Sequence, residues 1–137
     1  MITIHLGLKG IGKTKKLIDS VNTAIDSEKG NVICIAEGKR LMHDIRREAR
    51  LIDTDSFEIP NFDALSGFIS GIISRDFDIT HIFIDSVMKI VPNEDLANMD
   101  KFVTALEFLT KNFNVAFTMM VSATEKDAPE KVRKYTV

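Results

Sequence analysis

The chain is poor in cysteine, in net charge and in long hydrophobic runs, and each shortage excludes a class of protein. Cys34 is the only cysteine in 137 residues, which excludes an internal disulfide and a cysteine-ligated metal cluster. The formal net charge of −2 gives no general electrostatic basis for binding nucleic acid or an anionic membrane. No apolar run approaches the length of a membrane span, and the N-terminus shows no signal-peptide pattern. We therefore expect a cytoplasmic protein.

Short apolar runs alternate with amphipathic segments along the sequence. The strand candidates are residues 1–6, 31–36, 51–52, 81–85 and 115–121. The helix candidates follow residue 13, cover residues 40–49, begin at Pro60-Asn61 and begin near Asn93. This alternation is typical of a parallel sheet covered on both faces. We expect an α/β fold, a three-layer α-β-α sandwich with a mainly parallel five-stranded sheet, in a single domain over 1–137 with a core at 1–122 and a polar tail at 123–137.

A glycine-rich motif with a lysine and a threonine lies between the first strand candidate and the first helix candidate. It matches the phosphate-loop pattern G-x-x-x-x-G-K-[ST]. Backbone N–H groups of such a loop, at a helix N-terminus, would bind nucleotide phosphates. Lys13 would reach the β- and γ-phosphates, and the Thr14 hydroxyl would ligate Mg²⁺. The expected nucleotide-binding residues are Gly7, Leu8, Lys9, Gly10, Ile11, Gly12, Lys13 and Thr14.

A carboxylate follows the apolar residues 82–84. Asp85 stands at the end of that strand candidate, as in a Walker B segment, where a carboxylate holds Mg²⁺, usually through water. The alternative is an aspartate that caps the following turn. The phosphate-loop motif earlier in the chain favours the metal role.

The residues Ile84-Asp85-Ser86-Val87, followed by Pro92, resemble the Walker B segment of RecA recombinases. The element order over residues 1–122 also resembles the RecA-like branch of P-loop ATPases, in which an added strand separates the two Walker strands. The whole chain resembles small stand-alone ATP-binding proteins of Gram-positive bacteria. The resemblance implies a RecA-like P-loop NTPase core, with ATP as nucleotide and Mg²⁺ as cofactor. The chain lacks the DNA-binding loops of RecA proteins, so recombinase activity is not expected.

Two further site residues come from this resemblance. Glu37 matches the position at which RecA-like proteins keep the glutamate that activates water, and its competing interpretation is an exposed carboxylate beside Gly38. Ser122 stands where RecA proteins carry a polar sensor, often glutamine, and would sense the γ-phosphate. The two interpretations of Glu37 stay open at this point.

The chain has one concentration of basic residues, at 39–50. It could supply an arginine, Arg40 or Arg47, to the phosphates of a neighbouring subunit. Because acidic residues are interleaved, a solvated helix with i,i+4 charge pairs is the favoured interpretation. Because no arginine finger is assignable within the chain, a homo-oligomer or a protein partner that supplies an arginine is one expected route to activation.

These residues together predict Mg²⁺-dependent ATP binding with weak or partner-stimulated hydrolysis. Lys13, Glu37 and Asp85 are the expected catalytic residues, and Thr14 and Asp85 the expected metal ligands. ATP rather than GTP rests on the resemblance and on the absence of an N-K-x-D guanine motif. One alternative is a non-catalytic nucleotide-sensing interaction module whose switch is ordering of residues 122–137, and a second is a small nucleoside or metabolite kinase.

Overall fold

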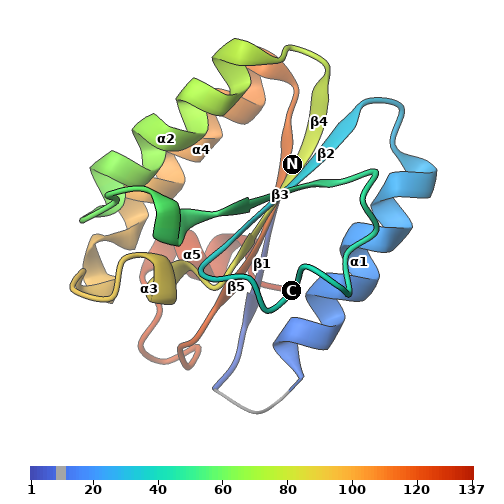
Figure 1. Cartoon of the computed structure of the whole chain (residues 1–137). Helices are drawn as coiled ribbons and strands as arrows, with labels where there is room; N and C mark the ends of the chain where they lie inside the picture. Colours follow the sequence, from blue (N-terminus) through green and yellow to red (C-terminus); the bar gives the residue numbers. More distant parts are fainter. Residues whose placement is uncertain (9–11) are drawn as a thin grey trace.

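The computed structural model describes residues 1–8 and 12–137. Strands and helices alternate through this part of the chain (Figure 1). The strands are β1 (Ile2–Leu6), β2 (Asn31–Ala36), β3 (Arg50–Asp53), β4 (Ile79–Asp85) and β5 (Ala116–Val121). The α-helices are α1 (Lys13–Ser27), α2 (Phe62–Arg75), α3 (Val87–Ile90), α4 (Met99–Phe113) and α5 (Glu130–Tyr135), and the 3₁₀ turns are η1 (Thr54–Ser56) and η2 (Leu96–Asn98).

The described strands form one five-stranded sheet in the order β1-β5-β4-β2-β3, and every neighbouring pair is parallel. β5 lies between β1 and β4, with Met119 in register with Ile4 on one side and Ile84 on the other. The predicted α/β class is confirmed, and so is the added strand between β1 and β4. Because all strands run the same way, the residues that follow β1, β2, β4 and β5 meet at one edge of the sheet.

Helices cover both faces of the sheet, which makes three layers (Figure 1). On one face, Leu17 and Val21 of α1 pack with Cys34, Phe83 and Met120 of the sheet. On the other face, α2, α4 and α5 enclose the larger core, whose buried side chains include Leu65, Ile69, Ile73, Phe102, Leu106 and Val132. The strands are buried from both sides, which explains why they appear in the sequence as continuous apolar runs.

The helix predicted over residues 40–49 is wrong, because this segment forms turns. Leu41, Ile45 and Ala49 are buried in the α1-side core, and their spacing of four residues is that of a helix face. Separate turn bonds hold the backbone instead, such as Ile45 N–H to the Leu41 carbonyl (3.1 Å) and Ala49 N–H to the Arg46 carbonyl (3.0 Å). Apolar spacing alone therefore did not distinguish a helix from successive turns.

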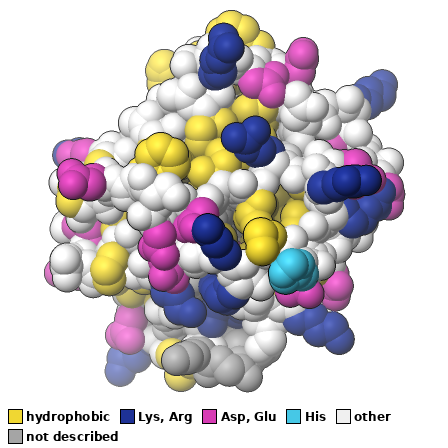
Figure 2. Space-filling view, in the orientation of Figure 1, with side chains coloured by type: hydrophobic (Ala, Val, Ile, Leu, Met, Phe, Trp, Pro, Cys, Tyr) yellow, Lys and Arg dark blue, Asp and Glu magenta, His cyan; other side chains and the backbone are white. Residues whose placement is uncertain are grey.

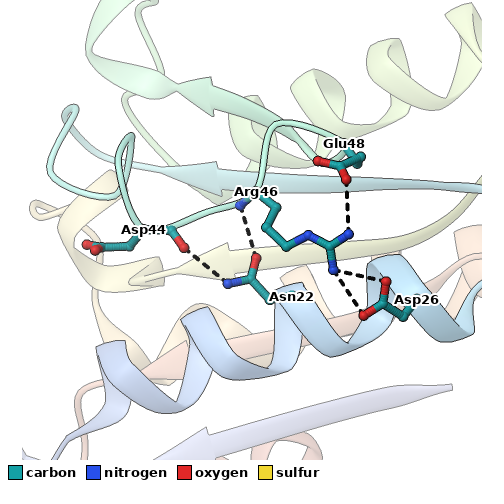
Figure 3. A network of polar contacts seen from close by, with 5 residues as sticks. All are labelled: Asn22, Asp26, Asp44, Arg46 and Glu48. Carbon is teal, nitrogen blue, oxygen red and sulfur yellow. Dashed lines mark hydrogen bonds and ion pairs between the residues drawn. The ribbon is translucent and has the colours of Figure 1, made fainter.

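The 40–49 segment is fastened to α1 by the polar network in Figure 3. The Asn22 side chain donates to the Asp44 carbonyl (3.1 Å) and accepts from the Arg46 N–H (3.0 Å). The Arg46 guanidinium donates to both Asp26 oxygens (2.9 and 3.0 Å) and to Glu48 (3.0 Å). Basic and acidic side chains are interspersed on the face drawn in Figure 2, which shows no broad surface of one charge.

Two other element boundaries differ from the prediction. α4 begins at Met99 rather than near Asn93, because the 3₁₀ turn η2 precedes it. The expected polar tail instead carries α5, with Val132 fully buried, and Thr136 bridges to Ile4 on the outer edge of β1. The start of α2 is confirmed, since the Asn61 side chain accepts the Ala64 N–H at 2.8 Å.

Candidate functional site

A cavity of about 440 Å³ lies where the carboxyl ends of β4 and β5 meet the start of α1. It brings together five of the predicted site residues, Gly12, Lys13, Thr14, Asp85 and Ser122, and adds Arg40, Ser86, Met88 and Lys89. Gly7, Leu8 and Glu37 do not belong to its described lining. Lys9, Gly10 and Ile11 lie outside the described residues. The motif residues and Asp85 thus converge in space although they are about seventy positions apart in the sequence.

Lys13 is the first residue of α1, and its ammonium turns back toward the end of β1. Nζ donates to the Gly7 carbonyl at 2.8 Å and to the Leu8 carbonyl at 3.0 Å. Gly12, just before it, has a φ of +85°, a left-handed conformation that glycine adopts without strain. Partial burial lowers the pKa of Lys13, and the Asp85 charge opposes this shift. The chain therefore presents a cation at the N-terminal end of α1.

Asp85 ends β4 and is almost completely buried, with 1% of its surface exposed. Its Oδ2 accepts from Arg40 Nη2 at 2.9 Å, and Arg40 Nη1 also lies 3.4 Å from Thr14 Oγ1. Burial raises the pKa of Asp85, while the charges of Arg40, Lys89 and Lys13 act in the opposite direction. The carboxylate pairs with Arg40 rather than capping the next turn, so the capping alternative does not describe its hydrogen bonding.

The Ser86 hydroxyl is a buried polar group without a partner. Ser86 is 4% exposed, and its Oγ has no hydrogen bond within the described part of the chain. Buried hydroxyls are nearly always hydrogen-bonded, since an unsatisfied one costs about 1–3 kcal/mol. Ser86 lines the cavity, but its Oγ is itself buried, so the hydroxyl would have to rotate to meet a ligand there.

Glu37 lies at the same edge of the sheet but outside the described cavity lining. It follows Ala36, which is in register with Asp85 on the neighbouring strand. The chain then turns at Gly38, which has a φ of +84° and whose N–H donates to Asp53 Oδ1 at 2.8 Å. Within residues 1–8 and 12–137, the Glu37 side chain forms no hydrogen bond or ion pair.

Three polar residues of the cavity were not predicted in these roles. Arg40 was expected on a solvated face or as a donor to a neighbouring subunit, whereas it reaches the cavity of its own chain. Ser86 was noted only as part of the Walker B resemblance. Lys89 follows Asp85 by four positions, and α3 returns it to the same cavity. The four-residue spacing of Asp85 and Lys89 was the available signal.

A larger hollow, of about 690 Å³, lies between α2 and α4. Its lining includes Phe77, Phe108 and Phe113, and its one described cation, Lys101, lies 3.7 Å from Asp63. The described lining of this hollow therefore lacks the three cations and the buried carboxylate that meet in the cavity around Asp85.

No protein-family model matches the chain, and no curated protein sequence matches it. In the two described ranges, no group of three or more His, Cys, Asp or Glu side chains is placed to hold a metal ion. Within the same ranges, no helix combines the length and the apolar character needed to cross a membrane.

Proposed function

We propose that the protein binds ATP with Mg²⁺ at the cavity around Lys13 and Asp85, and hydrolyses it slowly or when a partner stimulates it. The observation that carries this proposal is the convergence of three cations, Lys13, Arg40 and Lys89, on a cavity that also contains a buried carboxylate. The chemistry of this residue set suits a polyanion that arrives with a divalent cation.

The phosphate groups would face the cationic side of the cavity. The Lys13 ammonium, at the first residue of α1, would exchange bonds to the carbonyls of Gly7 and Leu8 for bonds to phosphate oxygens. The helix dipole adds positive potential at this end of α1. The exposed Ser122 gives a further hydrogen-bonding group on the same lining.

Thr14 and Asp85 are the residues that would hold Mg²⁺. They fit this role because both oxygens already share one cation, the Arg40 guanidinium, at 3.4 and 2.9 Å. A single carboxylate and a hydroxyl are enough, since Mg²⁺ in nucleotide sites keeps several waters and phosphate oxygens as ligands. When bound, the ion would neutralise charge on the phosphate oxygens.

Hydrolysis would require a residue from outside the described cavity lining. Glu37 would accept a proton from the attacking water, but it lies outside the described cavity lining. Slow turnover in the isolated protein is therefore expected, with acceleration when a partner draws residue 37 toward the site or adds a further arginine. The same observation favours the second candidate, a nucleotide sensor that binds ATP without hydrolysing it.

Calorimetric titration of MgATP and MgADP tests the proposal. We expect Lys13→Ala to weaken binding by about a hundredfold, in the range for a charged hydrogen-bond partner. The matched control is Lys15→Ala, which removes the same charge from an exposed position in the same first turn of α1 and should bind like the wild type. Equal affinity in wild type and Lys13→Ala would contradict the placement of the site.

Phosphate release, followed in the same samples, separates the two candidates. Turnover that Glu37→Gln abolishes while binding persists would establish a hydrolase. Binding without turnover would establish the sensor. Absence of binding to the wild type would overturn both.

A further inference from the structure

We propose that Arg40 and Mg²⁺ compete for the same two ligands, Thr14 and Asp85, so that Arg40 leaves them as the magnesium nucleotide enters. The inference rests on the proposed function. Its basis is the position of the guanidinium, with Nη2 2.9 Å from Asp85 Oδ2 and Nη1 3.4 Å from Thr14 Oγ1.

The two cations exclude each other. Mg²⁺ binds oxygen ligands at about 2.0–2.1 Å and retains a shell of water, which requires the space around the Thr14 and Asp85 oxygens. The guanidinium donors of Arg40 already point at those oxygens. Two cations on one buried carboxylate would also repel each other strongly, because the local dielectric is low.

Asp85 requires one of the two cations at all times. Its side chain is 2% exposed, and among the described residues Arg40 is its ion-pair partner within 4 Å. The Lys13 ammonium is held by the carbonyls of Gly7 and Leu8. A buried carboxylate that loses its counter-ion is strongly destabilising, so the departure of Arg40 must coincide with the arrival of another cation.

Arg40 can leave without unfolding the segment that carries it. Its side chain is 37% exposed, so a rotation of its own torsion angles brings the guanidinium into solvent or toward bound phosphates. The backbone of the following segment stays fastened to α1 through Asn22 and Arg46 (Figure 3). The exchange therefore requires movement of the Arg40 side chain only, while the backbone of the 40–49 segment stays in place.

The test measures the dissociation constant of a fluorescent ATP analogue in EDTA and in Mg²⁺. The quantity compared between variants is the dissociation constant in EDTA divided by that in Mg²⁺. In Arg40→Gln, binding in Mg²⁺ tightens because the competitor is gone, and binding in EDTA weakens because Asp85 then faces the phosphates without a counter-charge. We expect the ratio to rise by at least about tenfold over the wild type, the scale of a partly buried charge pair. Arg50→Gln, which removes an exposed arginine from the start of β3, should leave the ratio unchanged.

A second readout uses the metal alone. Mg²⁺ without nucleotide should raise the Tm of Arg40→Gln and leave that of the wild type unchanged, because a ligand stabilises only the fold that can bind it. Should Arg40→Gln fail to fold, Arg40→Lys replaces it. That variant keeps a cation with a single donor group and should give a ratio between those of Arg40→Gln and the wild type.

The outcomes separate the two proposals. A ratio in Arg40→Gln that equals or falls below that of the wild type overturns the competition while nucleotide binding stands. No nucleotide binding by the wild type overturns the proposed function. In that case the metal titration still decides the competition, which is supported if Mg²⁺ stabilises Arg40→Gln alone and is overturned if both proteins respond alike.

Discussion

Neutralising Arg40 and neutralising Asp85 should have opposite effects on the stability of the protein, because the two residues of this ion pair are buried to different extents. Asp85 is 2% exposed and Arg40 is 37% exposed, so dehydration falls mainly on the carboxylate. Arg40→Gln leaves a buried charge without a partner. Asp85→Asn leaves a cation that can turn to solvent, and the Asn oxygen still accepts a hydrogen bond. We therefore expect Arg40→Gln to destabilise the protein and Asp85→Asn to stabilise it slightly.

The geometry sets the size of these effects. Two charges about 4 Å apart attract by about 4 kcal/mol at an effective dielectric constant of 20. The partial exposure of Arg40 reduces this, so we expect Arg40→Gln to lose about 2 kcal/mol, below the range for fully buried pairs. For a chain of this length, that loss lowers Tm by about 6–8 °C. Asp85→Asn gives up both the attraction and the dehydration penalty, and we expect a gain of up to about 1 kcal/mol.

The pH dependence gives an independent check of the same reasoning. Burial raises the pKa of Asp85 above 3.8, so just above that pH the folded state keeps a proton that the unfolded chain has released. The contribution of this group to stability therefore falls as pH rises from 3.8 through the folded-state pKa. Asp85→Asn has no such titration. The difference in the free energy of unfolding between Asp85→Asn and the wild type should therefore grow as the pH rises from 3.8 through the folded-state pKa of Asp85, and then stay constant.

Urea and thermal unfolding without nucleotide or metal, from pH 4 to 8, measure these differences. Arg50→Gln serves as the control for loss of an arginine at the surface. If Asp85→Asn loses as much stability as Arg40→Gln, the attraction within the pair exceeds the cost of burying the carboxylate, and the reasoning is refuted.

Two further predictions concern packing around the sheet. In Gly30→Ala the new Cβ would lie 2.2 Å from the Asp78 carbonyl oxygen, so we expect a loss of about 3 kcal/mol in urea unfolding, whereas Gly67→Ala, with open space around it in α2, should gain about 0.5–1 kcal/mol. Equal effects of the two glycine substitutions would contradict the close approach of residue 30 to β4. Cys34 is fully buried, and burial together with the Asp85 charge raises its pKa to about 12, so iodoacetamide should modify it at pH 8 only as fast as the protein unfolds. Rapid labelling of the native protein would contradict this placement.

Much of the sheet could be predicted because buried parallel strands are continuous apolar runs. Residues 31–36 and 115–121 are such runs, and they form β2 (Asn31–Ala36) and β5 (Ala116–Val121). The turns at 40–49 could not be separated from a helix, because Leu41, Ile45 and Ala49 face the core at helical spacing while side chains of α1 hold the backbone between them. These hydrogen bonds come from α1, about twenty residues earlier in the chain, and the local spacing of apolar residues contains no information about them.

In the candidate site, too, local sequence patterns predicted some positions, while others depend on contacts with distant parts of the chain. Lys13, Thr14 and Asp85 were predicted to meet, because parallel strands deliver their carboxyl ends to one edge. The place of Arg40 depends on how the 40–49 segment is fastened to α1, and no pattern of neighbouring residues contains that information. Glu37 reached the predicted edge, but the turn at Gly38 leaves it outside the described lining.

The most direct test of nucleotide binding at this cavity is an amide chemical-shift map of the ¹⁵N-labelled protein titrated with MgATP. We predict that the largest shifts fall on Lys13, Thr14, Ser86, Lys89 and Ser122, which line the cavity from three separate segments. Saturation without shifts at these residues, or shifts centred on Phe108 in the hollow between α2 and α4, would contradict the account.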